Sequence, residues 1–259
     1  WDTLGPVSNV TRPCWLWIPA EGEPQLILSF VDHGRFAHIE VETITFVNRQ
    51  QMTARLREAL MDAVKVAMEY SPNAALPRVS RIDAGTKEFV TGLGVEIVSS
   101  ADLLQYASQR WDEDQLKSHE IAAQKLSQIV NEAFDHIGAS LASGITEYAV
   151  AEFIRGRFRE EGLVVTDGPA VAVNKHASDP HFDPTDPDAP AIKEGDWVLI
   201  DLWARLPGDD SMFGDITWTA YVGDKVPAKH REVFDAVIDA RDAALDELEK
   251  AHHDGRVLE

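Results

Sequence analysis

Two short apolar runs, each with one aspartate near its middle, constrain the fold of this chain more than any other feature. Residues 197–203 (Trp-Val-Leu-Ile-Asp-Leu-Trp) follow the turn signal Glu-Gly-Asp, and residues 213–221 follow a loop that contains Pro-Gly-Asp-Asp. Bulky and branched residues bounded by turn residues predict two strands joined as a hairpin with a long loop. Because side chains alternate between the faces of a strand, Asp201 shares one face with both tryptophans of its strand, and Asp215 shares one face with Thr217.

The chemistry of this pair favours a metal. An ionised carboxylate in water-poor β-structure is costly unless it is paired or binds a cation, and two on neighbouring strands repel each other. A shared divalent cation removes both costs and is typical of two-metal hydrolytic sites. We therefore predict that Asp201 and Asp215 are metal ligands. The alternative is that both lie at the rim of the sheet and face solvent.

The segments around these aspartates resemble the first half of the catalytic domain of the pita-bread metallopeptidases. That family includes methionine aminopeptidase, aminopeptidase P, prolidase and the metal-free creatinase. Its Pro-His-Tyr-like, Ile-Asp-x-Gly and Asp-Ile-Thr-Arg-Thr segments correspond here to residues 180–182, 200–203 and 215–219. Trp203 replaces the usual glycine and Trp218 the usual arginine, which bears on specificity more than on metal binding.

The resemblance implies roles for three residues. Asp201 and Asp215 would be metal ligands, and His181 would be the catalytic imidazole that helps to bind substrate and steadies the tetrahedral intermediate. His176 is a rival for the role of His181. The cofactors implied are two divalent metal ions in the full-length parent, with Mn²⁺, Co²⁺ and Zn²⁺ all compatible with carboxylate and imidazole ligands.

The family completes its site with a further histidine and two glutamates later in the chain. The pair 252–253 (His-His) lacks the glycines that flank the family's histidine, and we interpret it as a solvated helix end. We therefore expect the chain to be a fragment that lacks the second half of the catalytic domain. We expect it to bind metal weakly and to be inactive by itself.

Alternating strands and helices in residues 1–110 predict a small α/β domain with a partly parallel sheet. Two of its predicted elements are a helix over 55–68 and a strand over 77–82. The resemblance implies that this part is the creatinase-like N-terminal domain, and that residues 111–259 are the first half of the pita-bread domain, a curved antiparallel sheet covered by helices. The predicted fold class is thus α+β / α/β overall.

Residues 111–259 carry three predicted helices, over 112–138, 146–161 and 227–250, and a strand over 164–174. The first helix has the capping-box pattern of Asp112 and Gln115, and Gly138 is expected to end it. The last helix has an apolar stripe that should be buried against the sheet. Its expected members are Val233, Phe234, Val237, Ile238, Leu245 and Leu248.

Composition excludes several classes of protein. A formal net charge of −20 argues against nucleic acid as a partner and against an anionic membrane surface. Cys14 is the only cysteine, so the sequence can form neither an intrachain disulfide nor a cysteine-based zinc site. No apolar stretch approaches 18 residues, so no transmembrane helix is predicted.

The function that this resemblance implies is metal-dependent cleavage of N-terminal Xaa-Pro bonds by an aminopeptidase P or prolidase. Its partners would be short peptides with proline at the second position. A homodimer and a cytoplasmic location are also expected. Two alternatives stay open: a pita-bread binding protein without catalysis, and a creatinase-like amidinohydrolase that acts on a small molecule without metal.

Overall fold

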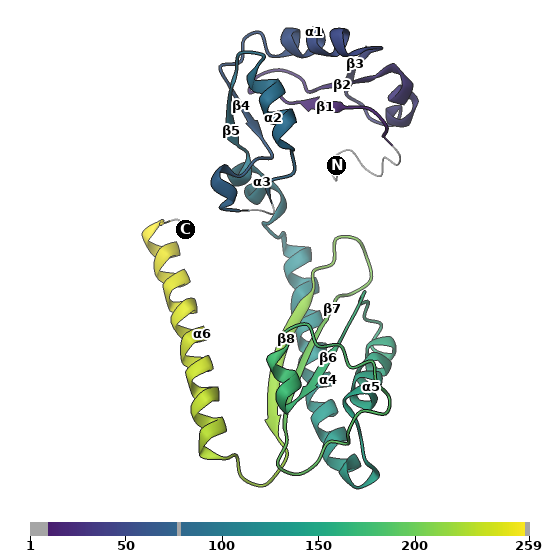
Figure 1. The fold of residues 1–259 in the computed structure, drawn as a ribbon, viewed down its shortest axis with the longest axis vertical. Coiled ribbons are helices and arrows are strands. Elements are labelled where there is room, and N and C mark those ends of the chain that lie inside the picture. Colours follow the sequence, from purple (N-terminus) through teal and green to yellow (C-terminus); the bar gives the residue numbers. More distant parts are fainter. Residues whose placement is uncertain (1–9, 77–78, 257–259) are drawn as a thin grey trace. The chain divides into compact units, whose positions relative to one another are not determined.

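The chain divides into two compact units, residues 1–110 and 111–259, and each is described by itself. The computed structural model describes residues 10–76 and 79–256 (Figure 1). Both units mix helices and strands, so the predicted combination of α and β structure is confirmed.

The first unit contains two small sheets. Strand β2 (Gln25–Ser29) pairs antiparallel with β1 (Cys14–Trp17) and parallel with β3 (Glu42–Phe46). Strand β4 (Lys65–Met68) pairs parallel with β5 (Glu96–Ser99). The helices of this unit are α1 (Arg49–Ala59), α2 (Ala84–Thr91) and α3 (Ala101–Ser108), with short 3-10 turns at Phe30–Phe36 and Pro72–Ala74. Parallel pairs joined through helices are typical of α/β units.

Two predicted elements of this unit are wrong. The helix expected over 55–68 is instead α1, which begins after the Asn48 cap, followed by strand β4. The apolar spacing fits a helix, but pairing with β5, 31 residues away in register, decides the outcome. In the segment 77–82, residues 77–78 lie outside the described part, and residues 79–82 form turns rather than a strand. There, the backbone N–H groups of Arg81 and Ile82 both donate to the carbonyl of Glu69.

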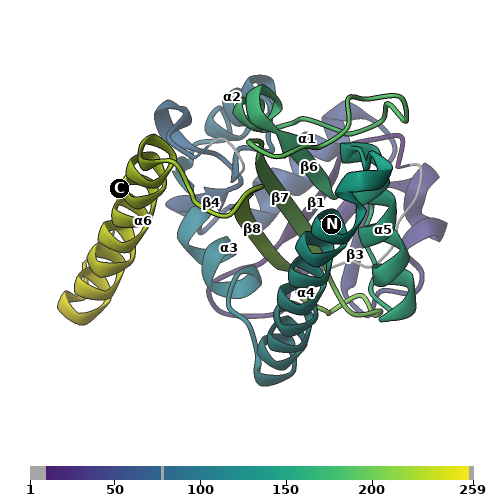
Figure 2. The ribbon, with the colours of Figure 1, turned by 90° about the horizontal axis from the view of Figure 1, so that it is seen from below.

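The second unit is a three-stranded antiparallel sheet in the order β6 (Ala170–Val173), β7 (Trp197–Ala204), β8 (Gly214–Tyr221). Helices α4 (Glu113–Ser140) and α5 (Glu147–Glu160) lie on one side of it (Figures 1 and 2). The short 3-10 turns of this unit are Leu141–Ser143 and Asn174–Ser178, and its last helix is α6 (Ala228–Asp254). The strand predicted over 164–174 is therefore shorter than expected.

Helix α4 begins as the sequence predicts and ends later. The side chain of Asp112 accepts the Gln115 N–H at 2.8 Å, and the Gln115 side chain accepts the Asp112 N–H at 3.0 Å. These two bonds form the predicted capping box. The helix passes through Gly138 without ending, and the left-handed glycine that follows it is Gly144, with a φ of +80°.

Strand β7 has the alternation that its sequence predicts. Val198, Ile200, Leu202 and Ala204 are fully buried against the helices, while the residues between them lie on the opposite, partly exposed face. The buried core of the unit joins this strand to α4 through Leu126 and Ile129, and to α5 through residues such as Ile154. The face that carries Asp201 therefore points away from the helices that support the sheet.

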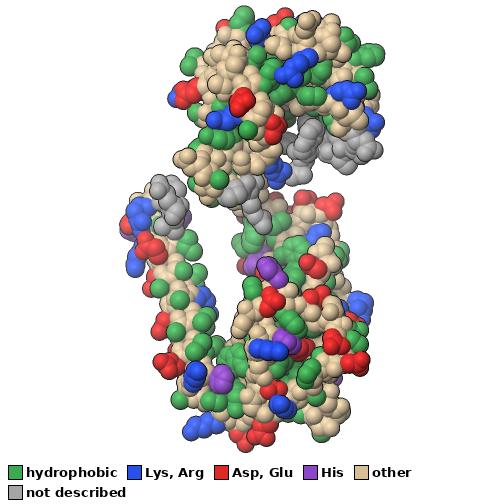
Figure 3. Space-filling view, in the orientation of Figure 1, with side chains coloured by type: hydrophobic (Ala, Val, Ile, Leu, Met, Phe, Trp, Pro, Cys, Tyr) green, Lys and Arg blue, Asp and Glu red, His purple; other side chains and the backbone are tan. Residues whose placement is uncertain are grey.

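Helix α6 differs from the expectation. Most of its apolar stripe is exposed, with 59% of Val233, 63% of Val237, 52% of Leu245 and 53% of Leu248 accessible to solvent, while Phe234 and Ile238 are partly buried. Figure 1 shows α6 standing away from the sheet, and Figure 3 shows hydrophobic side chains along its length. The periodicity predicted an amphipathic helix correctly but could not show what covers its apolar face. In the described part of the chain, no helix is both long and apolar enough to span a membrane.

Candidate metal centre

The β7–β8 hairpin brings the two predicted metal ligands onto one face of the sheet. Asp201 lies opposite Thr217, and Asp215 lies opposite Trp203, so the two aspartates are diagonal neighbours on adjacent strands. Diagonal side chains of an antiparallel pair are close enough to interact. The Thr217 hydroxyl donates a hydrogen bond of 2.7 Å to Oδ1 of Asp201 and so fixes one oxygen of that carboxylate.

The electrostatics of the pair suit a cation. Partial burial raises the pKa of Asp215, and the negative charge of Asp201 raises that pKa further. In the described part of the chain, the side chain of Asp201 accepts the Thr217 hydrogen bond, while the side chain of Asp215 forms neither a hydrogen bond nor an ion pair. Two carboxylates that repel each other, and that no basic side chain neutralises, fit a divalent ion.

Among the residues that the structure describes, the site has two carboxylates and no third ligand. Across residues 10–76 and 79–256, no three His, Cys, Asp or Glu side chains lie close enough together to hold a metal ion. His181 is therefore not brought to Asp201 and Asp215. The histidines at 252 and 253 lie at the end of α6, where His253 contacts Asp254, its neighbour, at 3.2 Å.

His181 lies in the loop after the turn Asn174–Ser178 and its side chain is exposed. Its backbone N–H donates to Oδ1 of Asp179 at 3.0 Å. Its rival is held more firmly: Nδ1 of His176 lies 2.9 Å from Oε1 and 3.0 Å from Oε2 of Glu147. Glu147 was not identified from the sequence. Its position in the first turn of a helix reads as a surface residue, yet it is 3% exposed.

Trp203 occupies the end of the exposed face beside Asp215. Its indole N–H donates to Oδ1 of Asp167 at 3.3 Å. The ring also lies against Gly168, where an added Cβ would be 2.6 Å from two of its carbons. Because Gly168 also has a φ of +83°, this position strongly favours glycine. Trp203 and the loop that precedes β6 therefore close one side of the aspartate pair.

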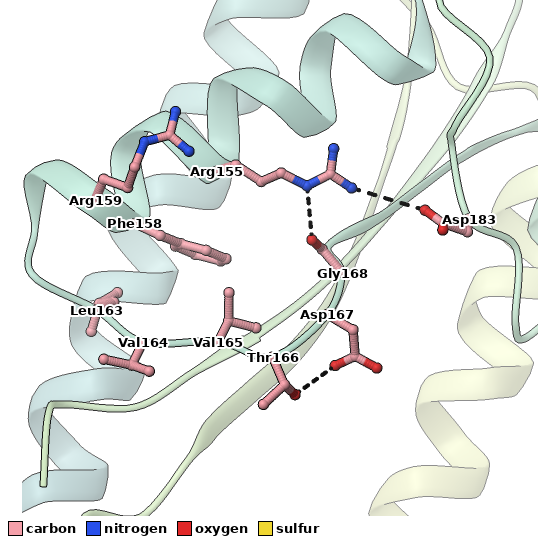
Figure 4. A pocket seen from close by; sticks show the side chains of 10 residues that line it. All are labelled: Arg155, Phe158, Arg159, Leu163, Val164, Val165, Thr166, Asp167, Gly168 and Asp183. Atoms are coloured by element: carbon pink, nitrogen blue, oxygen red, sulfur yellow. Dashed lines mark hydrogen bonds and ion pairs between the residues drawn. The ribbon is translucent and has the colours of Figure 1, made fainter.

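A pocket of about 520 Å³ lies between α5 and this loop (Figure 4). The guanidinium of Arg155 crosses it, with Nε donating to the Gly168 carbonyl at 3.0 Å and an ion pair of 3.9 Å to Asp183. Phe158 and Val165 supply apolar surface. The pocket thus has an apolar wall and a rim that carries both charges, next to the loop that contacts Trp203.

Comparison with known proteins gives a consistent result. The model of metallopeptidase family M24 matches residues 122–255. A methionine aminopeptidase from Archaeoglobus fulgidus is 32% identical over 135 residues, which are 52% of this chain and 42% of that protein. The chain thus spans less than half the length of this relative.

Solved structures of dipeptidase PepE from Mycobacterium ulcerans and of prolidase from Thermococcus sibiricus share the fold. The first has a TM-score of 0.57 and 21% identity, and covers 85% of this chain and 56% of its own. The second has a TM-score of 0.52 and 19% identity, and covers 93% of this chain and 62% of its own. The predicted relationship to the pita-bread metallopeptidases is confirmed, and the chain belongs to metallopeptidase family M24.

Proposed function

We propose that this chain supplies part of the active site of a metal-dependent peptidase that cleaves N-terminal Xaa-Pro bonds in short peptides. The observation that carries the proposal is the pair Asp201 and Asp215, which share one face of a sheet while no basic side chain of residues 10–76 and 79–256 forms an ion pair with them. Because the chain belongs to a metallopeptidase family, metal binding is the role that we assign to this pair. The resemblance of the fold to that of a prolidase supports the Xaa-Pro class.

Each residue has a defined task in this proposal. Asp201 and Asp215 hold the divalent ions, Mn²⁺, Co²⁺ or Zn²⁺, and Thr217 orients the carboxylate of Asp201. Two bound ions would polarise the scissile carbonyl and make a bound water more acidic. His181 donates a hydrogen bond to the substrate or to the developing oxyanion. Trp203 limits the space beside Asp215 and so restricts which side chains fit.

By itself, the chain should bind metal weakly and turn over no peptide, because its described residues bring together two ligands and no third. In the whole protein, further ligands would complete the site. A homodimer, a cytoplasmic location, and the lack of nucleic-acid and membrane partners stay predictions that accompany this proposal.

Titration calorimetry with Mn²⁺ tests the metal assignment in this chain. We expect weak binding that Asp201→Asn and Asp215→Asn each abolish. Asp210→Asn is the matched control, because this aspartate is exposed in the loop of the same hairpin. Micromolar affinity in the unaltered chain would contradict the two-ligand interpretation. Undiminished binding by Asp201→Asn, or retained peptide hydrolysis by the whole protein with that change, would refute the assignment.

A second candidate is a pita-bread binding protein without catalysis. The specific observation in its favour is Trp203, whose indole fills space beside Asp215 where the family usually has glycine. Peptide affinity and peptide hydrolysis of the whole protein, measured together, distinguish the two functions. A binding protein would retain peptide affinity when metal is removed and in Asp201→Asn, whereas a peptidase would lose hydrolysis in both cases.

A further inference from the structure

A buried carboxylate at the start of α5 holds the segment that leads to His181. Glu147 is 3% exposed, and its Oε1 accepts the backbone N–H of Val173, the last residue of β6, at 2.5 Å. Both of its oxygens also face Nδ1 of His176, at 2.9 and 3.0 Å. A buried carboxylate is stable only with such partners, so Glu147 requires a donor at this position.

The contact with Glu147 sets the chemical state of His176. Because the carboxylate is an acceptor, Nδ1 must carry the proton, and the neutral imidazole is therefore the Nδ1–H tautomer. Among the described residues, Nε2 has no hydrogen-bond partner, and the side chain is 33% exposed. The ring is thus fixed from its buried side and open on the other.

His176 also contacts the residues next to His181, through ring stacking and backbone hydrogen bonds. The imidazole stacks on the ring of Phe182, with centroids 4.3 Å apart and planes 20° from parallel. The carbonyl of His176 accepts the Asp179 N–H at 3.0 Å, and the carbonyl of Asp179 accepts the Phe182 N–H at 3.2 Å. The Asp179 side chain accepts the N–H of His181 itself at 3.0 Å. Residues 176–182 are therefore held together by contacts within the segment, and these contacts include the backbone of His181.

The same segment is also anchored to the sheet where it leaves β6. Asn174 has a φ of +52°, an uncommon conformation for a residue with a side chain. Its side-chain amide donates to Oδ1 of Asp196 at 2.8 Å, and its side-chain oxygen accepts the N–H of Trp197 at 2.9 Å. The 176–182 segment is thus attached to β7 at one side and to α5, through Glu147, at the other.

We propose that His176, oriented by Glu147 and stacked on Phe182, is a positioning residue that holds His181 for its contact with substrate. The pair acts through the backbone of 176–182 and not on the reacting atoms. The catalytic meaning rests on the proposed peptidase function, while the positioning itself does not. Loss of the Glu147–His176 contact should free the segment and leave the Asp201–Asp215 pair undisturbed, because eight residue pairs of the β7–β8 ladder hold these two strands together.

The test uses the 259-residue chain with His176→Gln and Glu147→Gln. His136→Gln is the matched control, because that imidazole also stacks on a phenylalanine, Phe153, at 4.4 Å, but has no carboxylate partner within the described part of the chain. ¹⁵N spectra should show His176 as the Nδ1–H tautomer in the unaltered chain and as a mixture in Glu147→Gln. In His176→Gln, hydrogen exchange at the amides of His181 and Phe182 should be about tenfold faster, while β7 amides and the control stay unchanged.

Several results would overturn the proposal. These are unchanged exchange at His181 and Phe182 in His176→Gln, an equal acceleration across β7, and an Nε2–H tautomer in the unaltered chain. If Glu147→Gln does not fold, His176→Gln still carries the test, because its side chain is partly exposed. None of these readouts needs metal or peptide, so they are independent of the Mn²⁺ titration. In the metal-loaded whole protein, His176→Gln should lower kcat about tenfold and leave the Mn²⁺ affinity unchanged. Loss of Mn²⁺ binding, or an unchanged kcat, would also refute the positioning role of His176.

Discussion

Gly214 is the point where β8, the strand that carries Asp215, meets helix α4, and Gly214→Ala should measure how tightly they pack. The residue is buried at the start of β8, next to Asp215. A Cβ placed there would lie 2.8 Å from the backbone nitrogen of Ala123 and 3.1 Å from the carbonyl carbon of Ala122, both in α4. It would also lie 3.0 Å from Cδ1 of Leu126.

The loss of stability in Gly214→Ala depends on which of the neighbouring atoms can move. A leucine methyl can rotate, but two of the three contacts are helix backbone in a filled core, so strand or helix must shift. Overpacking of this kind costs about 1–3 kcal/mol, and rigid neighbours place Gly214→Ala in the upper half of that range. For a unit of this size, a loss of about 2–3 kcal/mol lowers the Tm by about 4–12 °C.

Urea and thermal denaturation, followed by circular dichroism, give both quantities. Gly138→Ala is the control, since this exposed glycine lies within α4 and an added Cβ would meet nothing within 4 Å. It should raise stability by about 0.5–1 kcal/mol, because alanine is the better helix former. An unchanged Tm for Gly214→Ala would refute the close approach of β8 to α4. Because Asp215 is the next residue, Mn²⁺ affinity of the folded variant should fall as well.

Three further outcomes are expected. The hydrogen bond from Arg157 lowers the pKa of Glu132, so its stabilisation is complete above the ordinary pKa of 4.5 and is lost as pH falls through the lower folded value. Glu132→Gln should therefore cost about 0.5–1 kcal/mol at pH 7 in urea titrations, and its difference from the unaltered chain should vanish once the pH is below the lowered pKa of Glu132. Burial, aided by a nearby carboxylate, raises the pKa of the Cys14 thiol from 9.0 to about 11, so alkylation at pH 8 should be about a hundredfold slower than for a free cysteine; equal rates would contradict this. Trp203→Phe loses the indole N–H bond to Asp167 but keeps a ring against the loop, and urea titrations should show a loss of about 0.5–1.5 kcal/mol; no loss would mean that the bond contributes nothing.

Local features of this protein were predictable because their partners are close in the sequence. The capping box of Asp112 and Gln115 joins residues three apart, so the pattern contains the whole interaction. The alternation in β7 likewise needs only the period of a strand. The spacing predicted that Asp201 shares a face with the two tryptophans, whereas the packing of the helices decided that the other face is the buried one.

Some local patterns were nonetheless misleading. Residues 65–68 have helical spacing, but they form β4 because β5 supplies backbone partners. The apolar stripe of α6 was predicted correctly as a pattern, but the prediction that it is buried was wrong for most of its residues. Periodicity describes a single helix and gives no information about its neighbours. In both cases, the outcome depends on what packs against the element, which its own spacing does not contain.

The sequence by itself determined the elements of the second unit, the face on which each aspartate lies, and the family to which these segments are similar. Only the tertiary structure decided that Asp201 and Asp215 are diagonal neighbours, since this depends on the hairpin register across a loop of nine residues, 205–213. It alone also revealed that Glu147 holds His176, 29 residues away. The physical reason is that spacing along the chain specifies hydrogen bonds and faces within an element, whereas contacts between elements depend on how whole surfaces pack.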